Sequence, residues 1–543
     1  MSELAIPHPT DGLLLRAFEG LEPPAGLLDE IAAGGVPGVT LFLAANVASL
    51  QQVRELVDQL QAARPSGAPP LLVAIDQEGG QLMGLGPETT PFAGNLALGA
   101  AGDPELAEQV GAAIAAEVAE VGINVVYAPV CDLATEPRNP SLGLRSFGDD
   151  PVAVGTLAAA FVRGLERSGV AATVKHLPGL GAVGVDSHHQ LGVVPVDAAT
   201  LRQRELAVFR AALGAEPRLV MAAHVAVPAL TGRDDLPASL SSQVMTDLLR
   251  GELGFEGVAI TDALDMHALQ QDPDGQVQAA VAAVRAGVDL LLAAPDQAAM
   301  THVRDGLRSA LERGLLERDA LAASADRIAA LRRSLSAPGG ARGPADMAAH
   351  RQLAETLARR AVTVVRDRDA LLPLTGQERI VVIEPQPRDL TPADSSGQVR
   401  PTLGVSIRER LRRSGPAPAG TAEATSSPGT LGEVEVVVHA DPPSEQDVAA
   451  VLDRLLSADL VVLGVTAAAI DPAQRALARA VLDLGIPTVV VVQRSAADLE
   501  VVQDAGTVVL SYGLHQPSSE AVAAVLSGEV RAQGTLPVRN PGW

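Results

Sequence analysis

One short stretch of the chain gathers basic, acidic and glycine residues in a pattern suited to acid–base chemistry. It runs from Lys175 to His188 and reads KHLPGLGAVGVDSH. Its glycines and proline favour a loop that folds over a pocket. Asp186 and His188 are two positions apart, so the carboxylate can orient the imidazole and raise its basicity. A histidine held this way can protonate a leaving oxygen and then deprotonate water, although an Asp-x-His pair in a loop also occurs without any function.

Two aspartates follow buried apolar runs and are candidates for direct contact with a substrate. Asp262, in Ile-Thr-Asp-Ala-Leu-Asp-Met, has the position of a carboxylate that attacks an anomeric carbon and forms a covalent glycosyl-enzyme. Its alternative role is the N-cap of the following helix. Asp76, in Asp-Gln-Glu-Gly-Gly, is placed to hold two sugar hydroxyls, and its alternative is likewise a cap or turn.

Lys175 is the only lysine of the chain, and the other 40 basic residues are arginine. We interpret the retained ammonium as a sign that the site needs a compact point charge rather than a planar fork; chance survival is the alternative.

The remaining polar candidates are one arginine and three histidines. Arg145 is a candidate anchor for a hydroxyl or acyl oxygen, or else it forms a salt bridge with Asp149 or Asp150. His224 closes an apolar run and either binds substrate, which we favour, or satisfies a buried hydrogen bond. His189 and His267 receive no role.

These residues need a scaffold that brings the ends of several strands together. The sequence predicts seven buried strands, each a short, continuous apolar run: Gly38–Ala44, Leu71–Asp76, Asn124–Val130, Ala171–His176, Leu219–His224, Gly257–Asp262 and Val288–Ala293. Helical stretches separate them, a pattern typical of a TIM-like (β/α)8 barrel, with a weak eighth strand near Leu191–Val194. Asp76, His176, His224 and Asp262 all close predicted strands, where barrels build their active sites.

The chain continues into a second domain. We expect the barrel over residues 1–335, a linker over 336–346 and a C-terminal α/β/α sandwich over 347–543. Predicted strands of the sandwich are Ala361–Val365, Arg379–Glu384, Val434–His439, Leu460–Val465, Thr488–Val492 and Thr507–Leu510. Ser414–Thr430 is poor in large apolar residues and predicts a loop. We expect this domain to support the barrel, or to contribute a loop to the pocket or to a dimer interface.

The amino-acid composition limits the classes of binding partner, the cellular compartment and the kind of pocket that we expect. The formal net charge of -24 argues against nucleic acid and anionic membranes. A single cysteine fits a reducing compartment, and the N-terminus lacks the basic and apolar segments of a signal peptide. Aromatic residues make up 2% of the chain, which favours a small hydrogen-bonding pocket over a long stacking groove. We expect a cytoplasmic monomer or homodimer that binds a small substrate.

Ordered motifs along nearly the whole chain resemble the bacterial β-N-acetylglucosaminidases of glycoside hydrolase family 3. They are Asp76-Gln77-Glu78-Gly79-Gly80, Ala128-Pro129-Val130-Cys131-Asp132, Arg145-Ser146-Phe147-Gly148, Lys175-His176, Pro178-Gly179, Asp186-Ser187-His188, Ala223-His224-Val225, Thr261-Asp262-Ala263-Leu264, Ser511-Tyr512-Gly513 and Gly534-Thr535-Leu536-Pro537-Val538.

The resemblance implies a retaining hydrolase that needs no cofactor or metal. Asp262 matches the nucleophile, and His188 with Asp186 matches the acid/base of the N-acetylglucosaminidase branch. Residues that match sugar-contacting or pocket positions are Asp76, Arg145, Lys175, His176 and His224. The implied reaction releases terminal non-reducing β-N-acetylglucosamine from muropeptides or chito-oligosaccharides. Another exo-β-glycosidase of the family, such as a β-glucosidase, or a non-catalytic sugar-binding relative is the alternative.

Departures from the branch concern the lining of the pocket. Gln81 and Gly84 stand where the branch has arginines, and Leu177 and Leu180 replace a phenylalanine and a histidine of the loop. These changes therefore bear on which sugar the pocket binds more than on the reaction type. A metal-dependent hydrolase and a Schiff-base lyase using Lys175 remain open on residue types alone. A neutral His188 would also tolerate an anionic acceptor, so phosphorolysis beside hydrolysis is a further hypothesis.

Overall fold

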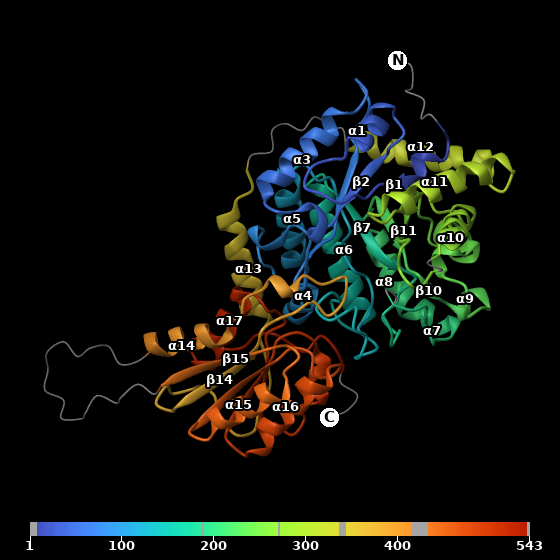
Figure 1. Cartoon of the computed structure of the whole chain (residues 1–543). Helices are drawn as coiled ribbons and strands as arrows, with labels where there is room; N and C mark the ends of the chain where they lie inside the picture. Colours follow the sequence, from blue (N-terminus) through green and yellow to red (C-terminus); the bar gives the residue numbers. More distant parts are fainter. Residues whose placement is uncertain (1–7, 187–188, 270–271, 336–343, 415–432, 540–543) are drawn as a thin grey trace, which may run out of the picture.

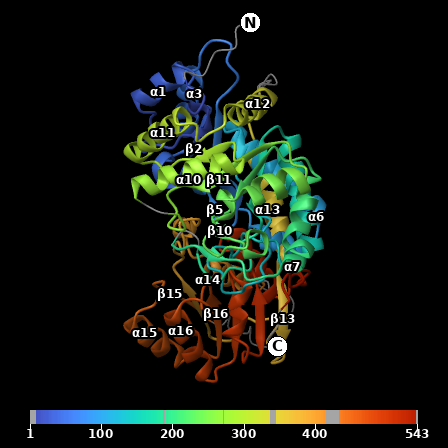
Figure 2. The ribbon, with the colours of Figure 1, turned by 90° about the vertical axis from the view of Figure 1, so that its right-hand side faces the viewer.

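The computed structural model describes residues 8–186, 189–269, 272–335, 344–414 and 433–539, and folds them into two domains that lie against each other (Figures 1 and 2). Eight parallel strands form the sheet of the first domain, in the order β1-β12-β11-β9-β7-β6-β3-β2. Their bounds are β1 (Leu14–Leu15), β2 (Gly38–Leu41), β3 (Leu72–Ile75), β6 (Val125–Val126), β7 (Ala171–Leu177), β9 (Leu219–Ala222), β11 (Val258–Ala263) and β12 (Leu290–Leu292).

The sheet closes into a barrel between its two outer strands. Arg16, directly after β1, forms a parallel bridge with Val39 of β2. The Arg16 amide donates to the Gly38 carbonyl at 3.0 Å, and the Thr40 amide donates to the Arg16 carbonyl at 2.8 Å. The predicted (β/α)8 barrel is therefore confirmed.

The prediction of the eighth strand was wrong. Strand β8 (Gly192–Val193) pairs with β10 (Val225–Ala226) in a small separate sheet, while β1 completes the barrel. The apolar run at β1 covers residues 13–15 and ends at Arg16, so no buried strand is apparent there in the sequence. Its partners β12 and β2 define it instead.

The alternation of side chains along the strands divides the barrel interior from the helical layer. Interior residues such as Leu72, Ala74, Tyr127 and Ile260 form one core cluster, which α12 (Arg318–Ser334) closes with Ile328 and Leu331. The alternate residues pack outward against helices. Because the interior cluster includes the first residues of most strands, α12 covers the amino ends and leaves the carboxyl ends open.

The helices of the first domain mostly surround the barrel. They are α1 (Ala25–Ala32), α2 (Leu43–Asn46), α3 (Leu50–Ala62), α4 (Asn95–Ala101), α5 (Pro104–Glu120), α6 (Pro151–Arg167), α7 (Ala198–Gln203), α8 (Glu205–Leu213), α9 (Pro228–Thr231), a π-helical segment (Gln243–Glu252), α10 (Pro273–Ala286) and α11 (Gln297–Glu312). Asp103, Asp150 and Asp272 each cap a helix whose first residue is proline. The aspartate satisfies free amides and the proline presets the first turn, so these Asp-Pro pairs fix where the helices begin.

The second domain is a three-layer sandwich, as predicted. Its sheet has the order β13-β18-β17-β16-β14-β15, with only β13 antiparallel to its neighbour. The strands are β13 (Thr363–Asp367), β14 (Ile380–Pro385), β15 (Val434–His439), β16 (Leu460–Val465), β17 (Thr488–Val492) and β18 (Thr507–Leu510). Helices α13 (Met347–Ala361), α14 (Leu403–Ser414) and α17 (Gln516–Leu526) cover one face, and α15 (Glu445–Leu455) and α16 (Pro472–Asp483) cover the other.

The chain order of the parallel strands reverses between β14 and β16. In open α/β sheets the crevice beyond the carboxyl ends at such a point is the usual ligand-binding place. Here the segment that follows β14 leaves this edge and reaches the mouth of the barrel. Most of the linker predicted over 336–346 and the loop predicted over Ser414–Thr430 lie outside the described residues.

Candidate active site

A cavity of about 680 Å³ opens at the carboxyl ends of the barrel strands. The interior positions of β3, β7 and β11 continue, two residues at a time, to Asp76, Lys175 and Asp262, and all three line this cavity. The register between β7 and β9 shifts between Val174 and Leu177. Such an irregularity re-aims side chains, and His176 lines the cavity beside Lys175.

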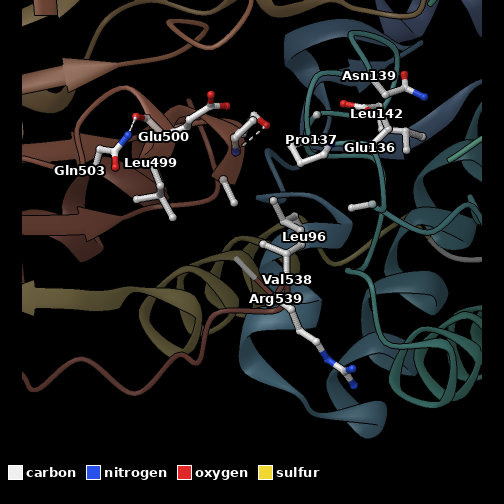
Figure 3. Close-up of a pocket in the computed structure, with 15 residues that line it drawn as sticks. Leu96, Glu136, Pro137, Asn139, Leu142, Leu499, Glu500, Gln503, Val538 and Arg539 are labelled. Atoms are coloured by element: carbon white, nitrogen blue, oxygen red, sulfur yellow. Dashed lines mark hydrogen bonds between the residues drawn. The ribbon is translucent and has the colours of Figure 1, made fainter. Parts of the chain in front are cut away.

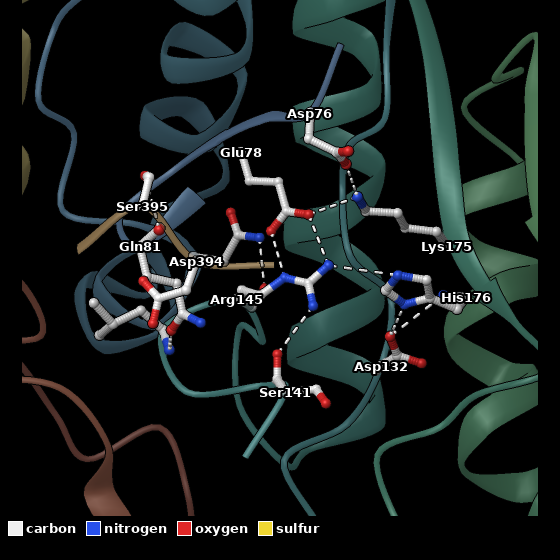
Figure 4. A network of polar contacts seen from close by, with 12 residues as sticks. Asp76, Glu78, Gln81, Asp132, Ser141, Arg145, Lys175, His176, Asp394 and Ser395 are labelled. Atoms are coloured by element: carbon white, nitrogen blue, oxygen red, sulfur yellow. Dashed lines mark hydrogen bonds and ion pairs between the residues drawn. The ribbon is translucent and has the colours of Figure 1, made fainter. Parts of the chain in front are cut away.

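A buried network of charges forms one end of the cavity (Figure 4). The Lys175 ammonium lies 2.6 Å from Asp76 Oδ1 and 2.6 Å from Glu78 Oε1. The Arg145 guanidinium donates to both carboxylate oxygens of Glu78, each at 2.9 Å, and to the Ser141 carbonyl. Arg145 therefore pairs with Glu78 and not with Asp149 or Asp150, the partners considered from the sequence.

This network holds its groups in their charged forms. Burial alone would lower the pKa of Lys175, but the Asp76 and Glu78 carboxylates outweigh it and raise that pKa above its ordinary value. Burial alone would raise the pKa of Glu78, but Arg145 and Lys175 lower it to about 2. Burial likewise opposes the charge on Arg145, and Glu78 raises its pKa beyond the ordinary value.

His176 is fixed by a carboxylate from the neighbouring strand end. Its Nδ1 lies 2.6 Å from Asp132 Oδ2, and the other oxygen of Asp132 accepts a hydrogen bond from the Leu180 amide at 2.8 Å. The Nε2 of His176 lies 3.5 Å from the Arg145 guanidinium. One buried aspartate thus orients the imidazole and ties down the start of the glycine-rich loop.

Asp262 stands at the cavity end of β11 with its side chain partly exposed. Its Oδ1 accepts the Ala263 amide at 2.9 Å. The Tyr127 hydroxyl, 2.7 Å from Thr40 Oγ1 inside the barrel, has a raised pKa because of burial and, to a smaller extent, because of the charges of Asp76 and Asp262. Both carboxylates therefore converge above the barrel interior.

His224 lies under the Asp262 segment and does not line the cavity. Its ring is fully buried, with Nδ1 2.7 Å from Ser239 Oγ and Nε2 3.2 Å from the Ala263 carbonyl. Burial lowers the pKa of His224. The structure thus places this residue as a support of the strand end, whereas the sequence favoured direct contact with substrate.

The acid/base loop is described in part. Asp186 is buried, and its carbonyl accepts the amides of His189 and Gln190 at 3.0 and 3.2 Å, which turns the chain back at this point. His188, the predicted acid/base, lies outside the described residues. His189, its neighbour, lines the cavity with an exposed side chain.

The second domain forms one wall of the cavity. The wall segment, which we define as residues 389–398, contributes Asp389, Thr391, Pro392, Ala393, Asp394, Ser395 and Gln398. Ser395 Oγ accepts the Met83 amide at 3.0 Å, and the Ser395 amide donates to the Gln81 carbonyl at 2.7 Å. The barrel and the second domain therefore build this cavity together.

Gln81 and Gly84 occupy different places in this arrangement. The buried Gln81 side chain accepts the Leu144 amide at 2.8 Å and does not line the cavity. Gly84 does line it, and an added Cβ there would lie 2.3 Å from the Asp76 carbonyl oxygen. As the backbone stands, no side chain fits at position 84.

A second cavity, of about 420 Å³, lies between the domains (Figure 3). Leu96, Glu136 and Leu142 of the barrel domain line it together with Leu499 and Val538 of the second domain. It shares no lining residue with the first cavity, and none of the predicted site residues reaches it.

The sequence reasoning assigned no site role to Glu78 or Asp132, and it allowed a pocket loop from the second domain without locating the wall segment. Glu78 and Asp132 belong to motifs quoted above, and Glu78 lies two residues after Asp76 in the same motif. That spacing was an available signal. The wall segment had no comparable signal, because its apolar and acidic residues resemble any surface loop.

Family models match both domains: the glycosyl hydrolase family 3 N-terminal domain over residues 21–331 and the C-terminal domain over residues 362–542. The chain belongs to glycoside hydrolase family 3. The β-hexosaminidase A of Pseudoalteromonas piscicida is 35% identical over 66% of this chain and 64% of its own length, slightly under two thirds. The β-hexosaminidase of Stenotrophomonas maltophilia (strain R551-3) is 37% identical over 57% of this chain and 92% of its own.

A solved structure extends the likeness to both domains. The family 3 β-N-acetylglucosaminidase of Paenibacillus sp. str. FPU-7 is 33% identical, with a TM-score of 0.88 and coverage of 98% of either chain. The resemblance stated from the motifs is therefore confirmed at the level of the family and its two-domain fold. Within the described part of this family 3 chain, no helix is long and apolar enough to cross a membrane.

Proposed function

We propose that this family 3 glycoside hydrolase is a retaining β-N-acetylhexosaminidase that releases terminal non-reducing β-N-acetylglucosamine. The observation that carries the proposal is the convergence of Asp262 with the Asp76–Lys175–Glu78–Arg145 network in one cavity at the barrel mouth. The printed names of its relatives, β-hexosaminidase and β-N-acetylglucosaminidase, support the choice of sugar.

Asp262 acts as the nucleophile in this mechanism. Its carboxylate attacks the anomeric carbon and forms a glycosyl-enzyme, which water then hydrolyses with net retention. His188, oriented by Asp186, donates a proton to the leaving oxygen and later removes one from water. His224 is a positioning residue, because its Nε2 hydrogen-bonds the backbone immediately after the nucleophile.

The buried end of the cavity binds the sugar. Asp76 is the network member with an exposed edge, since 28% of its side chain is accessible against 2% for Lys175 and 1% for Glu78. Its carboxylate therefore accepts hydrogen bonds from ring hydroxyls while Lys175 fixes its orientation. Arg145 and His176 complete this end, and buried donors and acceptors of this kind reject a ring that lacks the matching hydroxyl.

The natural substrates we propose are chito-oligosaccharides or cell-wall muropeptides, handled by a cytoplasmic monomer or homodimer. The alternative within the family is a β-glucosidase or a non-catalytic sugar-binding protein. Binding of a sugar without turnover would favour the latter.

Two other reaction classes fit the site less well. A Schiff-base lysine needs a neutral amine, whereas the Lys175 ammonium is held between two carboxylates that raise its pKa. Among the described side chains, no group of three or more His, Cys, Asp and Glu could hold a metal ion. Activity that survives a chelator would rule out the metal-dependent class, and sugar 1-phosphate in phosphate buffer would reveal phosphorolysis.

The deciding experiment compares aryl β-glycosides of N-acetylglucosamine and glucose with the wild type and Asp262→Asn. We expect release from the first substrate, and a loss of at least about a thousandfold in kcat on substitution. Nuclear magnetic resonance of the first-formed anomer should show the β configuration. Preference for glucose, or an α product, would contradict the proposal. Asp319→Asn, on the opposite end of the barrel in α12, is the control.

A further inference from the structure

The charges that line the active-site cavity are unequal in sign. Five carboxylates, of Asp76, Asp262, Asp265, Asp389 and Asp394, line it together with two permanent cations, Arg145 and Lys175. Both cations are already paired, with Glu78 and with Asp76 and Glu78 respectively. The cavity therefore has an excess of negative charge.

Two of the five lining carboxylates belong to exposed residues. Asp394 is buried and pairs with Arg494 at 2.6 Å. Asp265 and Asp389 are exposed, and neither forms an ion pair with another described residue. Asp265 follows the nucleophile by three residues on the barrel, whereas Asp389 belongs to the wall segment and accepts the Gly397 amide at 2.7 Å.

The two ends of the cavity have different tasks in the proposed reaction. The buried end, with Lys175, Arg145 and His176, encloses the sugar that is attacked. The exposed end faces solvent and must hold whatever is linked to that sugar. Asp265 and Asp389 line the cavity from the two domains and are exposed, so they are the carboxylates that a charged group at this end would meet.

We propose that the exposed end selects the leaving group by charge, and that it favours a cationic 2-amino sugar over an acidic one. The inference rests on the proposed function. The fitting substrate is a partly deacetylated chito-oligosaccharide, whose ammonium is attracted by Asp265 and Asp389. The carboxylate of a muramic acid residue is repelled by the same two groups. A substrate whose leaving group is N-acetylglucosamine, which is uncharged, is expected to have an intermediate kcat/KM.

Three disaccharides test the proposal. Each has β-1,4-linked N-acetylglucosamine at its non-reducing end, followed by glucosamine, N-acetylglucosamine or N-acetylmuramic acid. At about pH 6.5, below the pKa near 8 of such an amine, we expect kcat/KM to fall in that order by about three- to tenfold per step at low salt. The order should flatten in about 0.5 M salt, because mobile ions screen exposed charges.

Two charge-neutralising substitutions connect the preference to its source. Asp265→Asn with Asp389→Asn should bring the three values of kcat/KM together, while Asp319→Asn, an equal change in net charge at the far end of the barrel, should leave the order unchanged. The imidazoles of His189 and His267, which line the same cavity, are retained in every variant.

The outcomes separate this inference from the function on which it rests. Release from the aryl β-glycoside of N-acetylglucosamine tests the function alone, because its aglycone is uncharged. If that substrate is cleaved and the muramic acid disaccharide is cleaved as fast as the glucosamine one, charge selection is wrong and hydrolysis stands. If the double variant keeps the same order of kcat/KM among the three disaccharides, selection by Asp265 and Asp389 is also wrong.

Discussion

At the scale of single residues, the site depends on carboxylates and cations that neutralise one another away from water. Lys175 is the centre of this arrangement, because its ammonium contacts two carboxylates at 2.6 Å each. A chain that uses arginine at every other basic position has a physical reason to retain lysine here. A planar guanidinium with a longer reach does not fit a point between two oxygens already at contact distance.

Lys175→Arg should therefore behave as a disruptive substitution. We expect kcat/KM on the aryl glycoside to fall by about a hundredfold or more, with a lower melting temperature from crowding around Asp76. Lys175→Met, which leaves Asp76 without its cation and Glu78 with Arg145 alone, should reduce the free energy of unfolding by about 1–3 kcal/mol in urea titrations. Arg210→Lys, at an exposed ion pair, is the matched control and should change neither value measurably.

The depressed pKa of Glu78 predicts how stability depends on pH. Because the pKa is about 2 in the folded chain and ordinary in the unfolded one, the contribution is fully present above about pH 5 and is lost as pH falls toward 2. Its size at neutral pH is about 3 kcal/mol. Urea unfolding of Glu78→Gln and wild type should differ by this order at pH 7 and converge only as the pH falls to about 2. A difference independent of pH would contradict the argument.

At the scale of elements, the confirmed strand predictions are those that rest on continuous apolar runs. The sequence predicted seven barrel strands and six strands of the second sheet, because buried parallel strands are continuous apolar runs. It also placed Asp76, His176, His224 and Asp262 at strand ends. It missed β1, whose two residues are defined by pairing with β12 and β2, and it missed that Asp132 reaches His176. Both relations join elements distant in sequence, so no local pattern contains them.

A substitution at Asp132 tests whether this residue, which follows β6, fixes the start of the glycine-rich loop after β7. Asp132→Asn retains the shape but weakens the bonds to His176 Nδ1 and to the Leu180 amide. We expect kcat to fall by about tenfold to a hundredfold, with a smaller change in KM for the aryl glycoside. Asp149→Asn, which affects an exposed contact with Arg539, is the control. Equal loss of activity in both variants would show that the effect is not local to the loop.

At the scale of the whole molecule, the two domains share one cavity. The edge of the second sheet where strand order reverses supplies the wall segment, and backbone contacts at Gln81 and Gly80 attach that edge to the barrel. The interdomain cavity is also connected to the active site, through the glycine-rich loop. Its wall includes Asn139, whose side chain donates to the Leu180 carbonyl of the glycine-rich loop. The second domain thus contacts the barrel and forms part of the pocket through the same residues.

The ion pair between Arg494 and Asp394 is the brace of the wall segment, since both side chains are almost fully buried. Arg494→Met leaves a buried carboxylate unpaired and should cost about 3–5 kcal/mol in urea unfolding. If the wall lies at the leaving-group end, as proposed, KM for a disaccharide should rise by about tenfold while kcat on the aryl glycoside stays within about threefold.

The double variant Arg494→Met with Asp394→Asn separates charge from packing. Removing the second charge should restore part of the lost stability, because the penalty in the single variant is mainly that of an uncompensated buried carboxylate. Arg138→Met, at an exposed pair with Glu500 between the domains, should cost less than about 1 kcal/mol. If aryl-glycoside turnover and disaccharide KM change together in Arg494→Met, the wall serves the attacked sugar as well, and the assignment of that end to the leaving group is wrong.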